Sequence, residues 1–225
     1  MLIAHSTGNE KVAGPKRKRF LIPFSLLIVV LGGCSQTGGN GEGTCSTPTL
    51  TEGPYFVDEN LNRSDIRSDA GSGAVEEGTL LRLVLTIVDA ADCTPIPDAQ
   101  VDIWSANASG TYSDIASEGT VGREFLRGYQ VTDADGVVEF TTIFPGWYSG
   151  RTIHSHIKVR SGTQEFNTQL FFEQTVTNQI LAETPYADRG PADTTNSEDG
   201  IFSAETVVPL TPEGDGYAGS LDIGV

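Results

Sequence analysis

The fold class is decided by residues 80–89, which read LLRLVLTIVD. In this stretch Leu81, Leu83, Leu85 and Ile87 alternate with more polar neighbours. A period of two is typical of a β-strand that buries one face. Similar stretches follow at residues 99–106 (AQVDIWSA), 136–143 (GVVEFTTI) and 167–173 (NTQLFFE). No segment sustains a helical period, so the strands indicate an all-β protein.

Turn-forming residues separate the expected strands. Two prolines lie between Asp92 and Asp98, and the pair Asp135-Gly136 directly precedes one of the strand-like stretches. Long connections are expected around residues 109–127 and 183–206. The pattern predicts an antiparallel β-sandwich in which long loops carry the functional residues.

The first 33 residues have the features of an export signal. A basic stretch at 16–19 precedes an apolar stretch at 20–30, which is poorly matched to a bilayer span and well matched to a signal peptide. Leu31-Gly32-Gly33-Cys34 resembles a bacterial lipobox, in which cleavage falls before the cysteine and the cysteine is acylated. We therefore expect residues 1–33 to be a lipoprotein signal peptide. We expect Cys34 to anchor an exported protein to the membrane, on its periplasmic or extracellular face. An ordinary signal peptide with an incidental Cys34 is the alternative.

The composition of residues 34–225 indicates a short tether followed by one acidic domain. Residues 34–48 are rich in Gly, Ser and Thr, so a flexible tether is expected there and one folded domain over residues 49–225. Without residues 1–33, the chain keeps 9 of its 14 Lys and Arg and 29 of its 30 Asp and Glu, a net charge of −20. Such a surface repels nucleic acid, so no nucleic-acid partner is expected.

Two cysteines remain besides Cys34. An exported protein meets oxidising conditions, so Cys45 and Cys93 are predicted to form a disulfide. Closing a loop of nearly fifty residues would stabilise the fold by about 4 kcal/mol on the chain-entropy model.

The candidate functional residues are concentrated in residues 144–156, which read FPGWYSGRTIHSH. Residues two apart in a strand point to the same side, so Ile157 and Val159 are expected to face the core, with His154 and His156 together on the opposite face. Two imidazoles on one face can bind one metal ion. The alternative is a pair of surface histidines on a half-exposed strand, since His-x-His alone is a weak signal.

Two tyrosines accompany the histidines. Tyr148 lies in a Pro-Gly-Trp-Tyr turn just before the expected strand, and Tyr112 lies in the loop after another strand. Buried tyrosines in β-sandwiches are usually structural. A phenolate is nevertheless a hard anionic ligand, and a set of two imidazoles and two phenolates suits Fe³⁺ better than Zn²⁺ or Cu⁺.

Several stretches, in order, also carry a family resemblance. They are TEGPYF (51–56), CTPIPDAQVDIWSANASGTYSD (93–114), FPGWYSGRTIHSHIKV (144–159), NTQLFFE (167–173) and DTTNSEDGIF (193–202). Together they resemble the intradiol ring-cleavage dioxygenases. The likeness is greatest to small exported members related to protocatechuate 3,4-dioxygenase chains. It extends from about Cys45 to the C-terminus.

The resemblance implies a metal centre. It implies that Tyr112, Tyr148, His154 and His156 bind a non-haem Fe³⁺, with hydroxide or water as fifth ligand. The second tyrosine and second histidine are axial in such families, so Tyr148 and His156 are expected to be axial and the other two equatorial.

The resemblance also implies roles around the metal. Arg151 matches an arginine that stabilises negative charge on the activated substrate, and Gln169 matches a glutamine of the pocket. Gly53, Pro54 and Tyr55 match a segment that lines the mouth of the substrate site.

The implied activity is that of an oxidoreductase in aromatic compound catabolism. It would cleave a catechol ring between the two hydroxyl-bearing carbons, incorporate both atoms of O₂ and give a cis,cis-muconate. The Tyr148 to His154 spacing is shorter than in the cytoplasmic catechol and protocatechuate enzymes, so the loop that shapes their pockets is trimmed here. The helical N-terminal dimerisation region of catechol 1,2-dioxygenases is absent, so their dimer is not expected.

Two other functions remain open at this point. A non-catalytic prealbumin-like or metal-binding β-sandwich module on the cell surface explains the fold equally well, although it does not need two tyrosines and two histidines. A periplasmic metal chaperone would keep those ligands but needs neither Arg151 nor Gln169. Fold alone does not decide among these functions.

Overall fold

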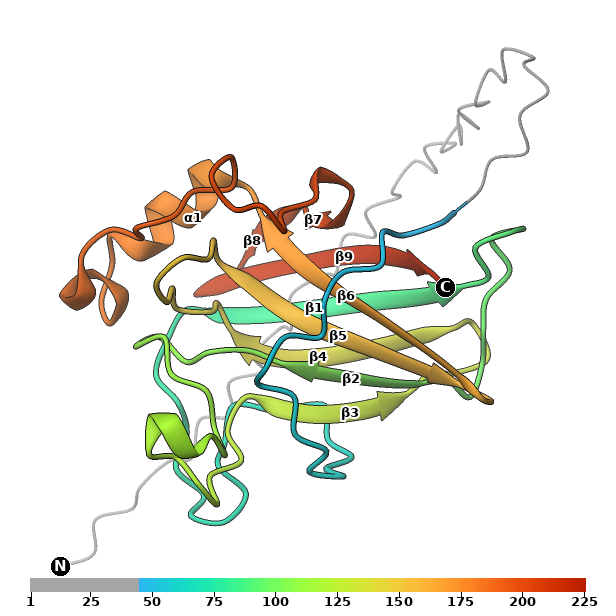
Figure 1. Ribbon diagram of the computed structural model, residues 1–225, viewed down its shortest axis with the longest axis horizontal. Coiled ribbons are helices and arrows are strands. Elements are labelled where there is room, and N and C mark those ends of the chain that lie inside the picture. The colour runs from blue at the N-terminus through green and yellow to red at the C-terminus, as the bar shows by residue number, and fades with distance from the viewer. Residues whose placement is uncertain (1–44) are drawn as a thin grey trace, which may run out of the picture. The chain divides into compact units, whose positions relative to one another are not determined.

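The alternating stretch that indicated a β-protein forms strand β1 (Leu80–Val88). Leu81, Leu83 and Leu85 on this strand are fully buried, whereas Arg82 and Val84 between them are partly exposed. The computed structural model describes residues 45–225, and β1 lies inside the first of two β-sheets (Figure 1). Within the described residues, no helix is long and apolar enough to cross a membrane.

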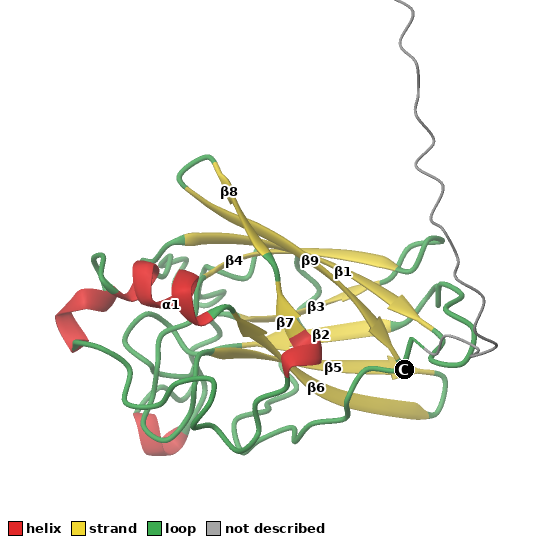
Figure 2. Cartoon of the chain, turned by 90° about the horizontal axis from the view of Figure 1, so that it is seen from above, coloured by secondary structure: helices red, strands yellow, loops and turns green. Residues whose placement is uncertain are grey.

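The described residues form two sheets. The first has the strand order β4-β1-β9-β8 and the second the order β3-β2-β5-β6-β7. Figure 2 shows the two sheets as separate layers. Besides β1, the strands are β2 (Gln100–Trp104), β3 (Arg127–Val131), β4 (Val137–Ile143), β5 (His154–Ser161), β6 (Gln164–Phe172), β7 (Val207–Val208), β8 (Leu210–Glu213) and β9 (Gly216–Gly224).

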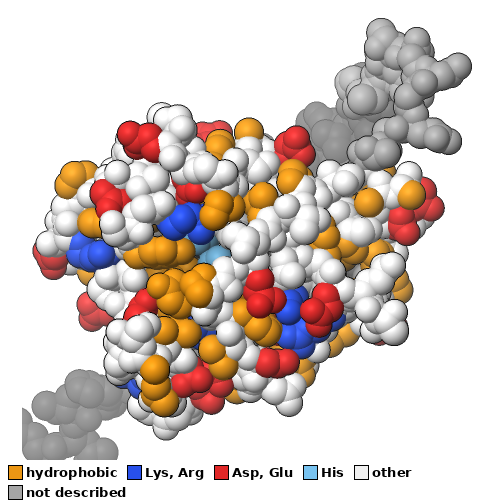
Figure 3. Space-filling view, in the orientation of Figure 1, with side chains coloured by type: hydrophobic (Ala, Val, Ile, Leu, Met, Phe, Trp, Pro, Cys, Tyr) orange, Lys and Arg blue, Asp and Glu red, His pale blue; other side chains and the backbone are white. Residues whose placement is uncertain are grey.

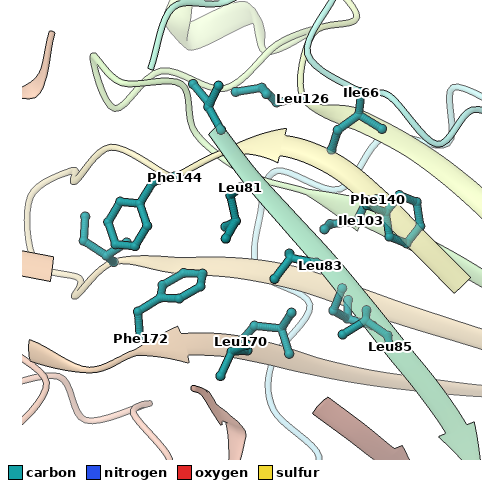
Figure 4. Packing of buried hydrophobic residues seen from close by; sticks show 14 of the residues in the cluster. Ile66, Leu81, Leu83, Leu85, Ile103, Leu126, Phe140, Phe144, Leu170 and Phe172 are labelled. Atoms are coloured by element: carbon teal, nitrogen blue, oxygen red, sulfur yellow. The ribbon is translucent and has the colours of Figure 1, made fainter. Parts of the chain in front are cut away.

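The main core lies between the sheets, where β1 contributes three leucines. Their side chains lie in one buried cluster with Ile103 of β2 and Leu170 of β6 (Figure 4). The expected β-sandwich is therefore confirmed, and its core is built from the alternate residues of facing strands, as sheet packing requires.

Strand pairing is mostly antiparallel, as expected, with two exceptions. Strands β1 and β9 are parallel, and so are β6 and the two-residue β7. A parallel pair cannot be joined by a tight turn. Because β1 and β9 are separated by most of the domain, no local turn signal in the sequence indicates this pairing.

One helix occurs that the periodicity did not indicate. Helix α1 (Gln174–Leu181) buries Thr177, Ile180 and Leu181. Eight residues make about two turns, so a period of 3.6 barely repeats. The long connections expected from the sequence are confirmed: residues 105–126 join β2 to β3, and residues 182–206 join α1 to β7.

The predicted disulfide between Cys45 and Cys93 is present, with a sequence separation of 48 residues. The amide of Cys45 also donates to the carbonyl of Ala90 at 3.1 Å. The beginning of the described chain is thus fixed to the connection that follows β1.

The predicted end of the tether needs correction. Thr47 N–H donates to the Gly224 carbonyl at 3.1 Å, and the Thr47 hydroxyl oxygen accepts from Gly224 N–H at 2.9 Å. Residues 45–48 therefore belong to the folded domain and not to a tether, because Cys45, Thr47 and Pro48 are hydrogen-bonded to the connection after β1, to β9 and to β6. The remainder of the predicted tether, Cys34 and the predicted signal peptide lie outside the described residues.

A segment that we call the strap, residues 50–63, crosses the outer face of the second sheet. Leu50 N–H donates to Asn167 of β6 at 2.9 Å, and Arg63 N–H donates to Tyr129 of β3 at 3.1 Å. Figure 1 shows the strap, in blue to teal, passing over this sheet. The outer face of β5 is consequently buried as well as its core face.

Candidate active site

The two histidines lie side by side on the outer face of β5, beneath the strap. His154 and His156 are 2% and 1% exposed, while Ile157 and Val159 face the core between the sheets. The predicted sharing of one strand face is confirmed. The alternative of two surface histidines is wrong, because the strap and neighbouring loops cover this face.

Donor atoms of three predicted ligands converge at this place. Nε2 of His154 lies 3.1 Å from Nε2 of His156 and 3.0 Å from the hydroxyl of Tyr148. Two ligand atoms each about 2.1 Å from one ion, at roughly a right angle, lie about 3 Å apart. The spacing of these three side chains therefore fits a shared metal ion.

Burial favours the neutral form of both imidazoles, and the tautomer of His154 is fixed by its backbone partner. His154 Nδ1 lies 2.7 Å from the carbonyl of Thr152, so Nδ1 carries the proton and Nε2 is free to bind a cation. Burial and the nearby Arg151 lower the pKa of His154 to about 3. Burial and the neighbouring His154 also lower the pKa of His156 well below its ordinary value. The two Nε2 atoms, 3.1 Å apart, are close enough to bind one cation together.

Tyr112 supplies a fourth, unpartnered oxygen. It is 1% exposed, and its hydroxyl has no partner at normal hydrogen-bond distance, although the Tyr148 hydroxyl is near enough to affect its pKa. Its ring lies 5.7 Å from the Tyr148 ring and 6.0 Å from the His156 ring. Burial raises the pKa of Tyr112 well above its ordinary value. A buried hydroxyl without a partner points to a missing ligand, and a bound cation would stabilise the phenolate that burial alone disfavours.

The loop after β2 fixes Tyr112. The Thr120 hydroxyl donates to the Tyr112 carbonyl at 2.7 Å, and Glu118 accepts from the Tyr112 amide at 2.5 Å. The buried Arg127 donates to the next residue, Ser113, through Nε and Nη2. This loop is therefore a rigid support for the tyrosine.

The sheet contributes a row of four side chains beneath the strap. Trp104 of β2 is paired with Arg127 of β3 on one side and with His156 of β5 on the other, and His156 is paired with Gln169 of β6. Trp104 and His156 stack with ring centroids 4.9 Å apart and nearly parallel planes. The stacking holds the His156 ring in one orientation.

The strap places the predicted mouth residues over the candidate ligands. Tyr55 stacks on Tyr112 with centroids 4.5 Å apart. Gly53 has a positive φ of 77°, and a Cβ there would lie 3.0 Å from Cε1 of His156. Pro54 lies exposed in the turn between them. Gly53 and Tyr55 thus lie beside the candidate ligands, while the lining of a substrate mouth by the three residues stays a prediction.

The close approach of Gly53 leads to a prediction. Gly53→Ala should strain the backbone by about 1–2 kcal/mol and displace His156, which should weaken metal binding about tenfold, as other changes around metal ligands do. Gly73→Ala is the matched control, because Gly73 has a φ of 74° but open space around its Cβ position. Metal titration and thermal unfolding measure the two effects. Equal metal affinity in both variants would show that the Gly53 contact does not matter.

Arg151 lies in the turn before β5, as the glycine-containing sequence indicated. Its Nη1 is 3.4 Å from His154 Nε2, and its Nη2 donates to the side-chain oxygen of Gln169 at 2.5 Å. Its Nε donates to Asp199 at 2.8 Å. Asp199 was not singled out as a site residue from the sequence, although it lies within one of the motifs quoted for the family resemblance.

The tyrosines are needed to complete a metal site. Among residues 45–225, no group of three or more His, Cys, Asp or Glu side chains is placed to hold a metal ion. The other protein atoms near the two histidines that could bind a metal are the phenolic oxygens of Tyr148 and Tyr112. In Figure 3 a small histidine surface is visible between hydrophobic and cationic side chains. Since His154 and His156 are the histidines of the described chain, at 2% and 1% exposure, the site reaches the surface only through a small opening on this face.

Comparisons with known proteins agree with this site. The family model described as Dioxygenase matches residues 51–195, and so includes the strap, all four candidate ligands and Arg151. The chain belongs to the intradiol ring-cleavage dioxygenase family.

Among the similar proteins, the catechol 1,2-dioxygenase of Acinetobacter baylyi is 37% identical over 106 residues, which cover 46% of this chain and 32% of that protein. The chain thus spans about a third of the length of this curated relative. A solved intradiol ring-cleavage dioxygenase from Tetranychus urticae is 33% identical, with a TM-score of 0.72, and the match covers 80% of this chain and 93% of that one. The dioxygenase domain of a carbohydrate-binding fusion protein from Streptomyces sp. SirexAA-E is 28% identical, with a TM-score of 0.61 and coverage of 80% and 97%.

Proposed function

We propose that this protein is a non-haem Fe³⁺ dioxygenase that cleaves a catechol between its two hydroxyl-bearing carbons and yields a cis,cis-muconate. The observation that carries the proposal is the convergence of Tyr148, His154 and His156 within 3.0 to 3.1 Å, beside the unpartnered hydroxyl of Tyr112. The relatives named as catechol and chlorocatechol 1,2-dioxygenases support the same substrate class.

The donor set favours ferric iron. The residues that would hold the ion are Tyr112, Tyr148, His154 and His156. Two phenolates supply negative charge that a hard trivalent ion matches better than a soft or monovalent one. When bound, the ion would act as a Lewis acid that binds both catechol oxygens and draws electron density from the ring.

Tyr148 is placed to move a proton. It is half-buried, in contrast to Tyr112, and burial raises its pKa above the ordinary value. A Tyr148 phenolate at this position could accept a proton from an entering catechol hydroxyl. Tyr112, which is buried and supported by its loop, stays in place.

Arg151 is placed to stabilise charge that develops on the substrate. Its Nη1 points at the same nitrogen, His154 Nε2, on which the candidate ligands converge. A fixed cation in a largely buried site stabilises developing negative charge without reorganisation during the reaction. This arrangement favours a catalyst over a metal-binding module or a metal chaperone, because holding a metal does not require a cation beside the ligands.

The proposal is tested by loading the protein with iron and adding catechol in air. We expect one iron per chain, a red to burgundy colour from phenolate-to-iron charge transfer, a spectral shift on adding catechol, and consumption of O₂. Colour and shift without any O₂ consumption would favour the metal-binding alternative. A colourless preparation after iron reconstitution would contradict the metal centre itself.

We also propose export and lipid anchoring through Cys34, which rests on the lipobox-like sequence at the end of the apolar stretch. In a bacterial host, labelled palmitate should be incorporated into the wild-type chain and not into Cys34→Ala. Equal incorporation into both proteins would contradict lipid anchoring through Cys34.

A further inference from the structure

Asp199 lies behind the metal ligands, in the long connection that follows α1. Its side chain is 1% exposed, and both carboxylate oxygens are used. Oδ2 accepts from Arg151 Nε at 2.8 Å and from Thr152 N–H at 2.9 Å, while Oδ1 accepts from Ile201 N–H at 2.8 Å. One buried carboxylate thus joins Arg151 to the backbone that leads into β5.

The three nitrogens of the Arg151 guanidinium have separate partners. Nε is held by Asp199, and Nη2 is held by the side-chain oxygen of Gln169, whose own amide nitrogen donates to the Thr51 carbonyl of the strap at 2.8 Å. Nη1 points to His154 Nε2 at 3.4 Å. Because the guanidinium is planar, fixing Nε and Nη2 also fixes the direction of Nη1.

We propose that Asp199 is a positioning residue of the ring-cleavage reaction, which aims Nη1 of Arg151 at the metal-bound substrate. This inference rests on the proposed function and assigns a role to a residue that does not itself touch the metal ligands. Thr152 supports the same geometry, because its amide is bonded to Asp199 and its carbonyl orients the His154 ring. Asp199 therefore links the orientation of the cation to that of a ligand.

The ionised state of Asp199 is consistent with this role. Burial by itself would raise the pKa of this carboxyl, but hydrogen bonds from Ile201, Thr152 and Arg151 outweigh it and hold the pKa below its ordinary value. An amide in place of the carboxylate cannot satisfy these contacts. Whichever way the amide is turned, its NH₂ group faces either the Ile201 N–H or the two donors on the other side. Asp199→Asn removes the negative charge beside Arg151 and leaves at least one of the three donors unpaired, so it should loosen the guanidinium while nearly keeping the volume of the side chain.

A double-mutant cycle in the iron-loaded protein tests the proposal. Asp199→Asn should lower kcat about tenfold or more with little change in KM. The orientation of Arg151 matters only in the transition state, because negative charge develops on the substrate there. If Asp199 acts through Arg151, then Asp199→Asn should change kcat by less than about twofold when Arg151→Ala is already present. Full additivity of the two substitutions would overturn the proposal.

Asp193 provides a matched control. It is an exposed carboxylate that accepts from the Ser149 hydroxyl at 2.7 Å and from Gly150 N–H at 3.1 Å, so it supports the same turn without touching Arg151. Asp193→Asn should lower kcat by less than about fivefold, as expected for an exposed interaction. A loss equal to that of Asp199→Asn would show that loop stability alone explains both effects.

A measurement without activity separates this inference from the proposed function. Crystal structures of the metal-free wild type and Asp199→Asn should show the Arg151 guanidinium ordered toward His154 in the first and turned away or disordered in the second. If the wild type cleaves no catechol, the proposed function fails, and these structures still decide whether Asp199 positions Arg151. An unchanged guanidinium in the variant would contradict the positioning role. If Asp199→Asn does not fold, the double variant with Arg151→Ala, which contains no unpaired buried charge, should recover stability.

Discussion

Tyr112→Phe is expected to remove ring cleavage while leaving the metal-free protein as stable as the wild type, or more stable. The Tyr112 hydroxyl has no hydrogen-bond partner at 1% exposure, so its removal relieves a buried unsatisfied group. The same change takes away one of the two proposed phenolate ligands. The visible band should weaken or shift, and kcat/KM should fall by at least about 10²-fold, the upper range seen for changes around metal ligands.

Tyr186→Phe is the matched control for that result. Tyr186 is also 1% exposed, but its hydroxyl donates to the Phe144 carbonyl at 2.6 Å and accepts from Thr79 N–H at 3.1 Å. Its loss should destabilise the fold by about 1–3 kcal/mol and leave the visible band unchanged. If Tyr112→Phe instead keeps the band and lowers stability, Tyr112 is a structural tyrosine and the proposed ligand set is wrong.

Arg151→Ala is expected to keep iron, colour and the spectral shift with catechol, yet lose about 10²-fold or more in ring cleavage, comparable to the loss of one oxyanion donor. Its Nη1 lies beside the ligands and is not one of them, so metal and substrate binding should persist. The loss should fall on kcat rather than on KM, because the charge that it stabilises develops after binding.

Arg160→Ala, on the strand that follows Arg151, provides a comparison. The Arg160 side chain is 22% exposed, close to the 15% of Arg151, and it is paired with Asp58 at 3.1 Å. Because this pair is half-exposed, its loss should change activity by less than about fivefold. If Arg151→Ala cleaves catechol as fast as the wild type, Arg151 has been assigned the wrong role.

The fold was predictable where a signal repeats along one segment. The alternation in β1 and β5 indicated the strands and the shared face of His154 and His156, because a period of two is a local property of the chain. The parallel pairing of β1 with β9 and the short helix α1 were not predictable in this way. The first depends on a distant pairing, and the second is too short to show its period.

The residues of the site were predictable from the sequence, but the contacts that hold them in place were not. The family resemblance and the donor chemistry indicated Tyr112, Tyr148 and the two histidines, and the glycine-containing turn explained how Arg151 could face them. The row that joins Trp104 to His156 depends on strand register, which the sequence specifies only through long-range packing.

Asp199 is the functional residue that sequence reasoning missed. It lies 48 residues after Arg151, in a connection without periodicity, and nothing in its local pattern distinguishes it from the other acidic residues of a strongly acidic chain. The motif that contains it resembled the family, but a motif by itself does not show which member faces the site.

The most direct test of the central claim is the identity of the product formed from catechol and isotopically labelled O₂ by the iron-loaded protein, determined by mass spectrometry. We expect the wild type to form cis,cis-muconate that carries two labelled oxygen atoms. Tyr112→Phe and Arg151→Ala should form much less of it. A product cleaved beside the hydroxyl-bearing carbons, a quinone without label, or no product from any catechol tried would contradict it.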